Sequence, residues 1–273
     1  MGRRLTLIAG SGALVPLVAD AARGSGDALQ VLDLVGRGDV VGDVVRPVSL
    51  SDAGALIEAV KTFRTTHLVL AGGVHISDAD REGLARAFGL AGRFARSLGD
   101  VGLAGMLLVY SRMIGIKLVG AQDIAPGLLA PAGRIAGPPV EPGHIVYAQA
   151  ALAAARAVGA IDLGQSVVLS GDRPIAAEDA GGTDALLARV AALRQAGLAG
   201  NGKSPLILAK AMKPRQPRFA DLPAIGPETV ANAAAAGIGL IVVEAKRSLL
   251  LDRPEIETEA SARGVSVIGL RHG

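Results

Sequence analysis

Four cationic side chains fall within nine residues in the last third of the chain, and a single carboxylate follows them. The cations are Lys210, Lys213, Arg215 and Arg218, and the carboxylate is Asp221. Such a group favours an anionic substrate, and a lone Asp beside it could hold a metal ion or orient a water molecule. A solvated basic loop is the alternative that composition alone leaves open.

The residues on either side predict where this basic segment lies. Residues 205–209 form a short apolar run that is typical of a buried strand, and residues 230–236 are typical of a helix. Ligands of open α/β sheets bind beyond the carboxyl ends of the strands. The sequence therefore predicts a binding site where this strand ends.

A second polar segment joins another predicted strand to a predicted helix. It contains Glu178, two glycines and the pair Thr183 and Asp184. The glycines would let the backbone approach a ligand, and the carboxylates of Glu178 and Asp184 would supply the oxygen ligands that Mg²⁺ prefers. In the structural alternative, Thr183 or Asp184 is the N-cap of the helix.

A glycine-containing turn follows the first predicted strand and opens a helix. Its backbone N–H groups could cradle a phosphate or a ribose, and the residues concerned are Ser11, Gly12, Ala13 and Leu14. Asp33 ends the second strand at the distance where dinucleotide-binding proteins carry a ribose-binding acid. However, Val15 occupies the place of the third glycine in that fingerprint, which counts against NAD(P).

Two further glycines, Gly72 and Gly73, end a buried strand predicted at residues 67–71. Because glycine has no side chain, a ligand could approach the backbone closely at this point. A turn that merely ends the strand is an equally good interpretation.

The bulk composition narrows the classes of function. The chain has no cysteine, which excludes disulfides, cysteine-ligated metals and thiol nucleophiles. The net charge of +3 favours anionic partners, but aromatic residues make up only 2%, so stacking platforms for nucleic acid would be scarce. The longest run of apolar and glycine residues, 233–243, is too short to span a bilayer, although peripheral membrane contact stays open.

The order of elements predicts an α/β fold with two domains. Apolar strands alternate with helices in the first half, as in a parallel, doubly wound sheet, and a β-hairpin is expected around Gly171 and Asp172. Prolines and glycines concentrate between residues 126 and 143. We expect a Rossmann-like domain at 1–132, a linker at 133–143 and a mixed α/β domain at 144–273, with a ligand cleft between the domains.

Several motifs, taken together and in order, resemble the LpxI family, the UDP-2,3-diacylglucosamine pyrophosphatases of lipid A synthesis. The resemblance covers nearly the whole chain. The segments are LIAGSGAL at 7–14, LVGAQD at 118–123, GLLAP at 127–131, GGTDALL at 181–187, KAMKPRQ at 210–216, DLPAIGPET at 221–229 and VVEA at 242–245.

The resemblance implies a dimeric enzyme that hydrolyses the pyrophosphate of UDP-2,3-diacylglucosamine. The products would be UMP and 2,3-diacylglucosamine 1-phosphate (lipid X). It also implies a divalent cation, Mg²⁺ or another such as Mn²⁺, and a place at the cytoplasmic face of the inner membrane of a Gram-negative bacterium.

Site roles carry over to the matching residues of this sequence. Asp221 falls on the acid before Leu-Pro in the family motif and is the expected catalytic and metal-binding residue. Lys210, Lys213 and Arg218 would offset phosphate charge, with Thr183 close by. Apart from the family motifs, the residues themselves suggest that uridine docks near Ser11, Gly12 and Gln122. They also suggest that Asp184 and Glu178 complete the metal site.

Two other functions remain open at this stage. One is an NAD(P)-dependent oxidoreductase that uses the first domain as a Rossmann unit. The other is a sensor that binds a sugar nucleotide or lipid without turning it over.

Overall fold

The computed structural model describes residues 2–74, 77, 80, 100–200, 204–214, 219 and 222–271 of the chain, without the side chains of residues 100–106. Two compact units result. The first contains the residues up to Gly127, and the second contains Leu128–Gln216 and Leu222–Gly273. The prediction of two α/β domains, one with a parallel sheet and one with a mixed sheet, is confirmed.

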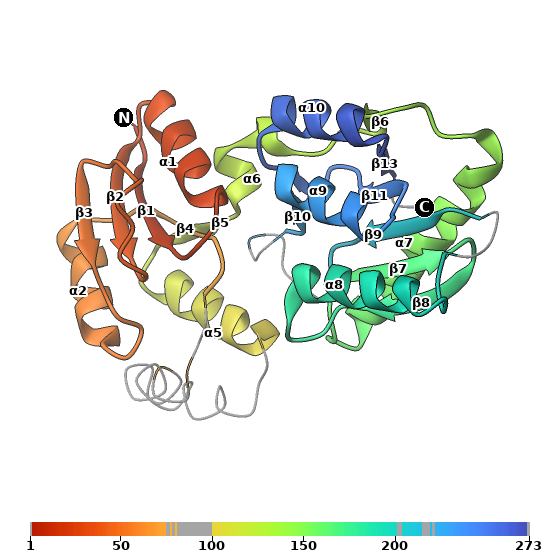
Figure 1. Ribbon diagram of the computed structural model, residues 1–273. Coiled ribbons are helices and arrows are strands. Elements are labelled where there is room, and N and C mark those ends of the chain that lie inside the picture. Colours follow the sequence, from red (N-terminus) through yellow and green to blue (C-terminus); the bar gives the residue numbers. More distant parts are fainter. Residues whose placement is uncertain are drawn as a thin grey trace. The chain divides into compact units, whose positions relative to one another are not determined.

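The first unit is built on a five-stranded parallel sheet with the strand order β3-β2-β1-β4-β5 (Figure 1). Its strands are β1 (Arg4–Ala9), β2 (Ala28–Asp33), β3 (Val44–Pro47), β4 (His67–Ala71) and β5 (Lys117–Val119). Its helices are α1 (Leu14–Gly24), α2 (Ala53–Thr62), α5 (Asp100–Met113) and α6 (Ala121–Ile124), and the 3-10 turn η1 (Pro126–Leu128) follows.

Helices lie on both faces of this sheet. Asp52 caps α2, because its Oδ1 accepts the N–H of Ala55 at 3.0 Å. The buried cluster under α2 consists of Leu32, Leu56, Ala59, Val60, Leu68 and Ile116. The chain runs from β1 outward to β2 and β3 and then returns through α2 to β4, on the other side of β1 (Figure 1). The order of the strands therefore reverses between β1 and β4, the place where such sheets usually bind ligands.

The second unit has a six-stranded mixed sheet with the order β6-β13-β11-β9-β7-β8. The strands are β6 (Gly133–Ala136), β7 (Ser166–Ser170), β8 (Arg173–Ala177), β9 (Leu206–Lys210), β11 (Leu240–Glu244) and β13 (Ser266–Leu270); β10 (Ala224–Ile225) and β12 (Leu249–Leu250) form a separate pair. The helices are α7 (Ile145–Ala160), α8 (Gly182–Gln195), α9 (Pro227–Ala235) and α10 (Arg253–Arg263), and η2 (Pro142–His144) precedes α7.

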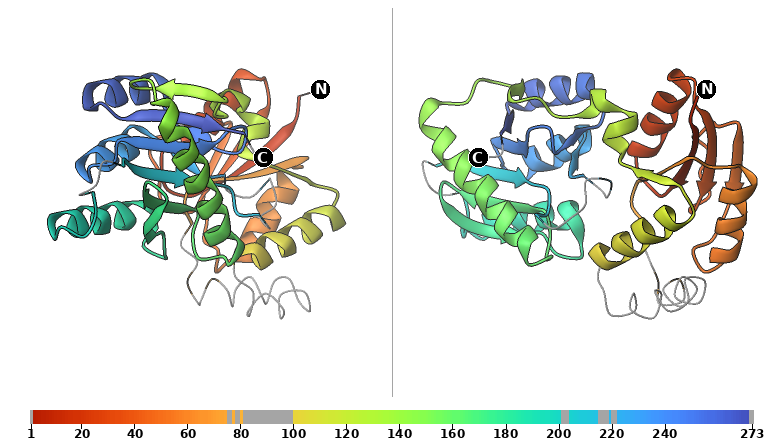
Figure 2. Two further views of the ribbon diagram at one scale, coloured as in Figure 1. Left: turned by 90° about the vertical axis from the view of Figure 1, so that its right-hand side faces the viewer. Right: turned by 180° about the vertical axis from the view of Figure 1, so that it is seen from behind.

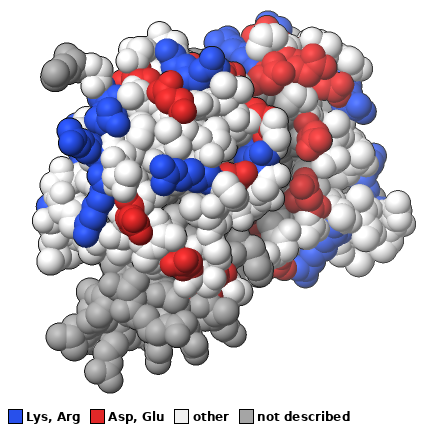
Figure 3. Space-filling view, turned by 90° about the vertical axis from the view of Figure 1, so that its left-hand side faces the viewer, with Lys and Arg blue, Asp and Glu red and all other residues white. Residues whose placement is uncertain are grey.

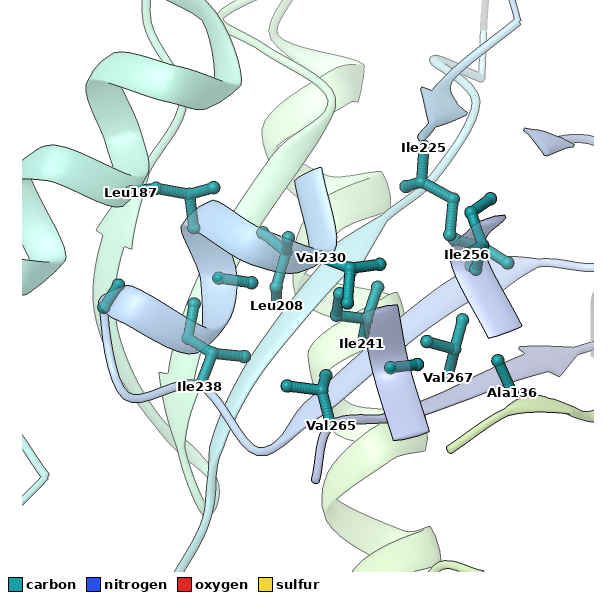
Figure 4. Packing of buried hydrophobic residues seen from close by; sticks show 14 of the residues in the cluster. Ala136, Leu187, Leu208, Ile225, Val230, Ile238, Ile241, Ile256, Val265 and Val267 are labelled. Carbon is teal, nitrogen blue, oxygen red and sulfur yellow. The ribbon is translucent and has the colours of Figure 1, made fainter. Parts of the chain in front are cut away.

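Two hydrophobic clusters hold this second sheet between its helices. On one face, α7 packs its alanines and Leu152 against Ile207, Val242 and Ile268. On the other face, residues of α8, α9 and α10 interlock with the sheet, as Figure 4 shows for Leu187, Val230 and Ile256 around Leu208 and Ile241. The turned views in Figure 2 show α7 on the opposite side of the sheet from α8 and α10. Burial on both faces explains why β9 and β11 are apolar almost throughout.

The segment at 133–143, for which the composition suggests a linker, contains a strand. Residues Gly133–Ala136 form β6, which pairs antiparallel with β13 at the edge of the second sheet. Pro131 O lies 1.9 Å from the point where a Cβ would stand on Gly269, so the two backbones can approach this closely only because residue 269 is glycine.

Charged side chains of both signs lie on the face drawn in Figure 3. In the part of the chain that the structure describes, no helix has both the length and the apolarity needed to cross a membrane.

Candidate functional site

The second unit places a buried cation at the carboxyl end of β9. Lys210 is the last residue of that strand and is only 5% exposed. Its Nζ donates to Thr183 Oγ1 and to the carbonyl oxygen of Ala224, each at 2.9 Å. The cation therefore ties together the end of β9, the first turn of α8 and the segment before α9.

The sheet register brings these elements to one edge. Ser166 begins β7, which runs antiparallel to β9, and it pairs directly with Lys210. Its hydroxyl lies 3.4 Å from Thr183 Oγ1. The hydrogen bond between Lys210 and Thr183 places the start of α8 beside the end of β9.

The structural alternative, in which Thr183 or Asp184 caps α8, is wrong. The helix begins at Gly182, and its N-cap is Gly181, which makes no side-chain cap hydrogen bond. Gly182 has a φ of +76°, a conformation that suits glycine, so the glycine pair makes the turn itself. Thr183 thus lies inside the first turn, and its hydroxyl is left for Lys210.

Glu178 lies beneath the same hydroxyl. This buried carboxylate accepts the N–H of Gln165 at 3.3 Å and the hydroxyl of Thr183 at 3.5 Å. Thr183 therefore bridges a buried cation and a buried carboxylate. These hydrogen bonds help to hold the Lys210 ammonium in place.

Asp184 lies outside this buried group. It is exposed on α8, and its Oδ1 accepts a hydrogen bond of 3.2 Å from Asn232 Nδ2 on α9. Among the described residues, no three His, Asp or Glu side chains form a cluster that could hold a metal ion. Glu178 and Asp184 alone therefore supply an incomplete set of ligands.

The start of α8 beside Lys210 is suited to an anion. The N–H of Gly181 donates to Asp179 Oδ1 at 2.8 Å, and that of Gly182 donates to the Asp179 carbonyl at 3.0 Å. The N-cap itself gives the following N–H groups no side-chain cap, and a helix N-terminus carries a partial positive charge. A buried ammonium 2.9 Å from the first turn adds a full positive charge. A phosphate would be favoured at this edge, since it could meet both.

The second predicted lysine has a different environment. Lys213 Nζ forms an ion pair with Asp162 Oδ1 at 2.7 Å, just beyond the end of α7. Its charge is therefore already offset by a carboxylate. Arg215, Arg218 and Asp221 lie outside the described residues.

In the first unit, the glycine turns after β1 and β4 contact each other. The backbone N–H of Ser11 donates to the carbonyl of Gly73 at 2.8 Å, and the N–H of Gly73 donates back to Ser11 at 2.9 Å. The Ser11 hydroxyl also donates to Gly73 O at 3.1 Å. The two turns thus form a small bridge where the strand order reverses.

This bridge explains why glycine stands at Gly10 and Gly72. A Cβ on Gly10 would lie 2.3 Å from Gly73 O, and one on Gly72 would lie 2.2 Å from Ser11 O. Gly72 also has a φ of +84°. By contrast, Gly12 has a φ of +94° with open space around it, so a ligand could reach the backbone there. Ala13 is the N-cap of α1 and Leu14 its first residue, again without a side-chain cap.

Asp33 does not offer a free carboxylate to a ribose. Its Oδ1 accepts the N–H groups of Val35 and Gly36 at 3.0 Å, and its Oδ2 accepts that of Arg37 at 2.6 Å. Arg37 in turn donates to the carbonyl of Gly10 at 2.8 Å. The acid at the end of β2 therefore shapes its own loop.

Gln122 of the same unit is buried on α6. Its amide packs under Gly120, where a Cβ would lie 2.3 Å from Gln122 Nε2.

The comparison with family models covers both units. The LpxI N-terminal domain matches residues 4–128, and the LpxI C-terminal domain matches residues 131–268. The chain belongs to the LpxI family. A curated LpxI relative from Caulobacter vibrioides, named UDP-2,3-diacylglucosamine pyrophosphatase LpxI, is 33% identical over 276 residues, which is 98% of each chain.

Two solved structures show a distant likeness to this chain. The enzyme WbmG from Bordetella bronchiseptica, in complex with NAD and UDP, matches with a TM-score of 0.32 at 14% identity, over 95% of this chain and 89% of that one. N5-carboxyaminoimidazole ribonucleotide synthetase from Thermotoga maritima matches with a TM-score of 0.27 at 14% identity, over 66% and 42%. Both likenesses are too distant to indicate a shared function.

Sequence reasoning assigned no role to Glu244, although the family motif VVEA contains it. The structure buries this carboxylate at the end of β11. A charged residue at the end of an otherwise apolar strand, LIVVE, was the available signal, because buried carboxylates need a partner.

Proposed function

We propose that this chain hydrolyses the pyrophosphate of UDP-2,3-diacylglucosamine to UMP and 2,3-diacylglucosamine 1-phosphate, in lipid A synthesis. The observation that carries this proposal is the full-length match to a relative of that name, with 98% of both chains aligned. The alignment includes both units, so the proposal does not depend on one shared domain.

The edge of the second sheet supports phosphate chemistry. Lys210 and the first turn of α8 supply positive charge where a pyrophosphate oxygen would bind. In the reaction, the oxygen of water forms a bond to one phosphorus while the P–O bond to the bridging oxygen breaks. The electron pair leaves on that oxygen, and the water proton passes to solvent. A preorganised cation lowers the barrier, since negative charge develops on the phosphoryl oxygens.

Asp221 is the residue that we propose for catalysis and for a divalent cation. When bound, Mg²⁺ or Mn²⁺ would polarise the phosphate and lower the pKa of a bound water. Asp184, whose carboxylate is exposed, could also bind the cation. Glu178 is less available, because both of its carboxylate oxygens already accept hydrogen bonds. The lysines, Arg218 and Thr183 would then bind the phosphates.

We also propose that the first unit binds the uridine nucleotide. Gly12, Ala13 and Leu14 present uncapped backbone at the start of α1. We further propose that the protein acts as a homodimer in peripheral contact with the cytoplasmic face of a Gram-negative inner membrane. Each buried methylene of the acyl chains contributes about 0.8 kcal/mol, so two chains would hold the substrate without a membrane span.

The test is UMP release from UDP-2,3-diacylglucosamine by wild type, Asp221→Ala and the control Asp172→Ala, with Mg²⁺ and with chelator. Asp172 is exposed in the β7–β8 turn, so its loss should leave activity unchanged. We expect metal-dependent release that Asp221→Ala abolishes. Running the reaction in ¹⁸O-labelled water would show which phosphorus is attacked, because the label enters only that product.

Absence of UMP from well-folded wild type with every divalent cation would overturn the proposal. An oxidoreductase would instead change nicotinamide absorbance, and the engaged carboxylate of Asp33 counts against it. A sensor would bind the substrate without releasing UMP.

A further inference from the structure

Glu244 is a buried carboxylate that the proposed reaction does not use. It is the last residue of β11 and is 1% exposed. Its Oε1 pairs with Arg156 Nη2 of α7 at 3.2 Å and with Arg247 Nη1 at 3.6 Å. Two guanidinium groups therefore share one of its oxygens.

The other oxygen of Glu244 holds main chain. Its Oε2 accepts the N–H of Met212 at 3.2 Å. The preceding N–H, that of Ala211, donates to the carbonyl of Gln165 at 2.9 Å. These two hydrogen bonds fix the first two residues after Lys210, in the segment that leads to Lys213.

Lys210 and Glu244 end the neighbouring strands β9 and β11, and their side chains lie on opposite faces of the sheet. Lys210 pairs with Val243 across the two strands, and side chains of paired residues share a face. Val243 belongs to the cluster under α8 and α9, whereas Val242 belongs to the cluster under α7. Because side chains alternate, Glu244 shares the α7 face with Val242, in agreement with its contact to Arg156. The chain thus leaves β9 between two buried charges of opposite sign.

Burying the Glu244 carboxylate at this position is unfavourable by itself. Taking a charge out of water costs free energy that its partners must offset, so an apolar side chain of similar size would be no worse for packing. An apolar side chain could not accept the Met212 N–H. Glutamine has one acceptor oxygen. The guanidinium groups of Arg156 and Arg247 attract that oxygen, so the amide NH2 group would face the Met212 N–H and could not accept from it.

We propose that Glu244 is a positioning residue for pyrophosphate hydrolysis. It fixes the backbone that leaves β9 and so directs the segment that carries Lys213 and continues toward Asp221 in the sequence. This inference rests on the proposed function for its kinetic part. Its structural part, the anchoring of Met212 by Glu244, can be tested without any activity.

The experiment compares Glu244→Gln with the matched control Arg247→Gln. Arg247→Gln removes one charge from Glu244 but leaves the Met212 hydrogen bond intact. We measure hydrogen exchange of peptides that contain Met212, the melting temperature, and kcat and KM for UMP release. We expect Glu244→Gln to speed exchange at Met212 and to lower kcat by up to about 10²-fold with little change in KM, because a small displacement at a reacting centre costs that much. Arg247→Gln should stay within about 2-fold of wild type on this reasoning.

Unchanged exchange at Met212 in a folded Glu244→Gln protein would overturn the inference. So would a loss of kcat that Arg247→Gln reproduces, or one that merely follows the lost folded fraction. If wild type releases no UMP, the proposed function fails, and the exchange result still decides whether Glu244 anchors Met212.

Discussion

Lys210 Nζ lies 2.9 Å from Thr183 Oγ1, and this contact joins the end of β9 to the first turn of α8. The same hydroxyl reaches Glu178 at 3.5 Å. Thr183 therefore works as a neutral spacer between two buried charges. In the proposed site, the Thr183 hydroxyl therefore fixes the position of the Lys210 ammonium that would bind a phosphate.

The first prediction concerns this hydroxyl. Thr183→Val keeps the shape of the side chain but cannot accept from Lys210, whereas Thr183→Ser keeps the hydroxyl. We expect Thr183→Val to lower kcat by about 10²-fold or more, in the range for one preorganised polar group, and Thr183→Ser to retain most activity. Steady-state UMP release measures both. Equal activity in the two variants would show that the hydroxyl does not position Lys210.

A second prediction separates the two kinds of glycine in the first unit. Gly72→Ala places a Cβ 2.2 Å from Ser11 O, so backbone must move, while Gly12→Ala meets open space and only the strain of a positive φ. We expect Gly12→Ala to cost about 1–2 kcal/mol of the free energy of unfolding and Gly72→Ala to cost clearly more. Urea denaturation measures this difference. A larger loss in Gly12→Ala would contradict the bridge between the turns.

Local pattern predicted much of the fold. The apolar run at 205–209, predicted as a buried strand, lies almost wholly within β9, which is buried throughout. The hairpin turn at Gly171 and Asp172 lies between β7 and β8 as expected. These elements follow from residue type and period, which a sequence displays directly.

The sequence does not show which residues contact each other when they are far apart in the chain. Gly72 and Gly73 are typical of a ligand-binding turn, yet their close neighbour is the turn at Ser11, which is about 60 residues away in sequence. Asp33 stands where a ribose-binding acid would stand, but its partners are N–H groups of its own loop. Thr183 is a residue type that often serves as an N-cap, but its hydroxyl accepts a hydrogen bond from Lys210, which lies on β9. In each case, the partner of a polar or small residue depends on packing.

The third prediction is a pH dependence centred on His67, at the start of β4. Burial lowers the pKa of its imidazole, and the nearby charges of Arg3 and Lys117 lower it further. In the unfolded chain the imidazole titrates near its ordinary pKa of about 6.5, so below that pH the unfolded state binds more protons. Stability should therefore fall as pH drops through about 6.5 toward the lower folded pKa.

His67→Gln should remove this dependence, since glutamine does not titrate. The measurement is the free energy of unfolding of both proteins at pH 7.5 and 5.5. We expect the wild type to lose more stability than the variant over this range. An identical loss in both would mean that His67 is not the group responsible.

The fourth prediction asks what Asp33 does. In the wild type, the N–H of Arg37 donates to Asp33 Oδ2 at 2.6 Å. Asp33→Asn keeps an oxygen that can accept from Val35 and Gly36, but its NH2 group would face the Arg37 N–H and could not accept from it. Loss of a hydrogen bond to a charged acceptor should cost about 1.5–3 kcal/mol of stability. If the carboxylate serves only its loop, the KM for UDP-2,3-diacylglucosamine should stay close to that of wild type. A raised KM with unchanged stability would instead show that Asp33 contacts the nucleotide, and its hydrogen bonds to the loop would then have to open when the nucleotide binds.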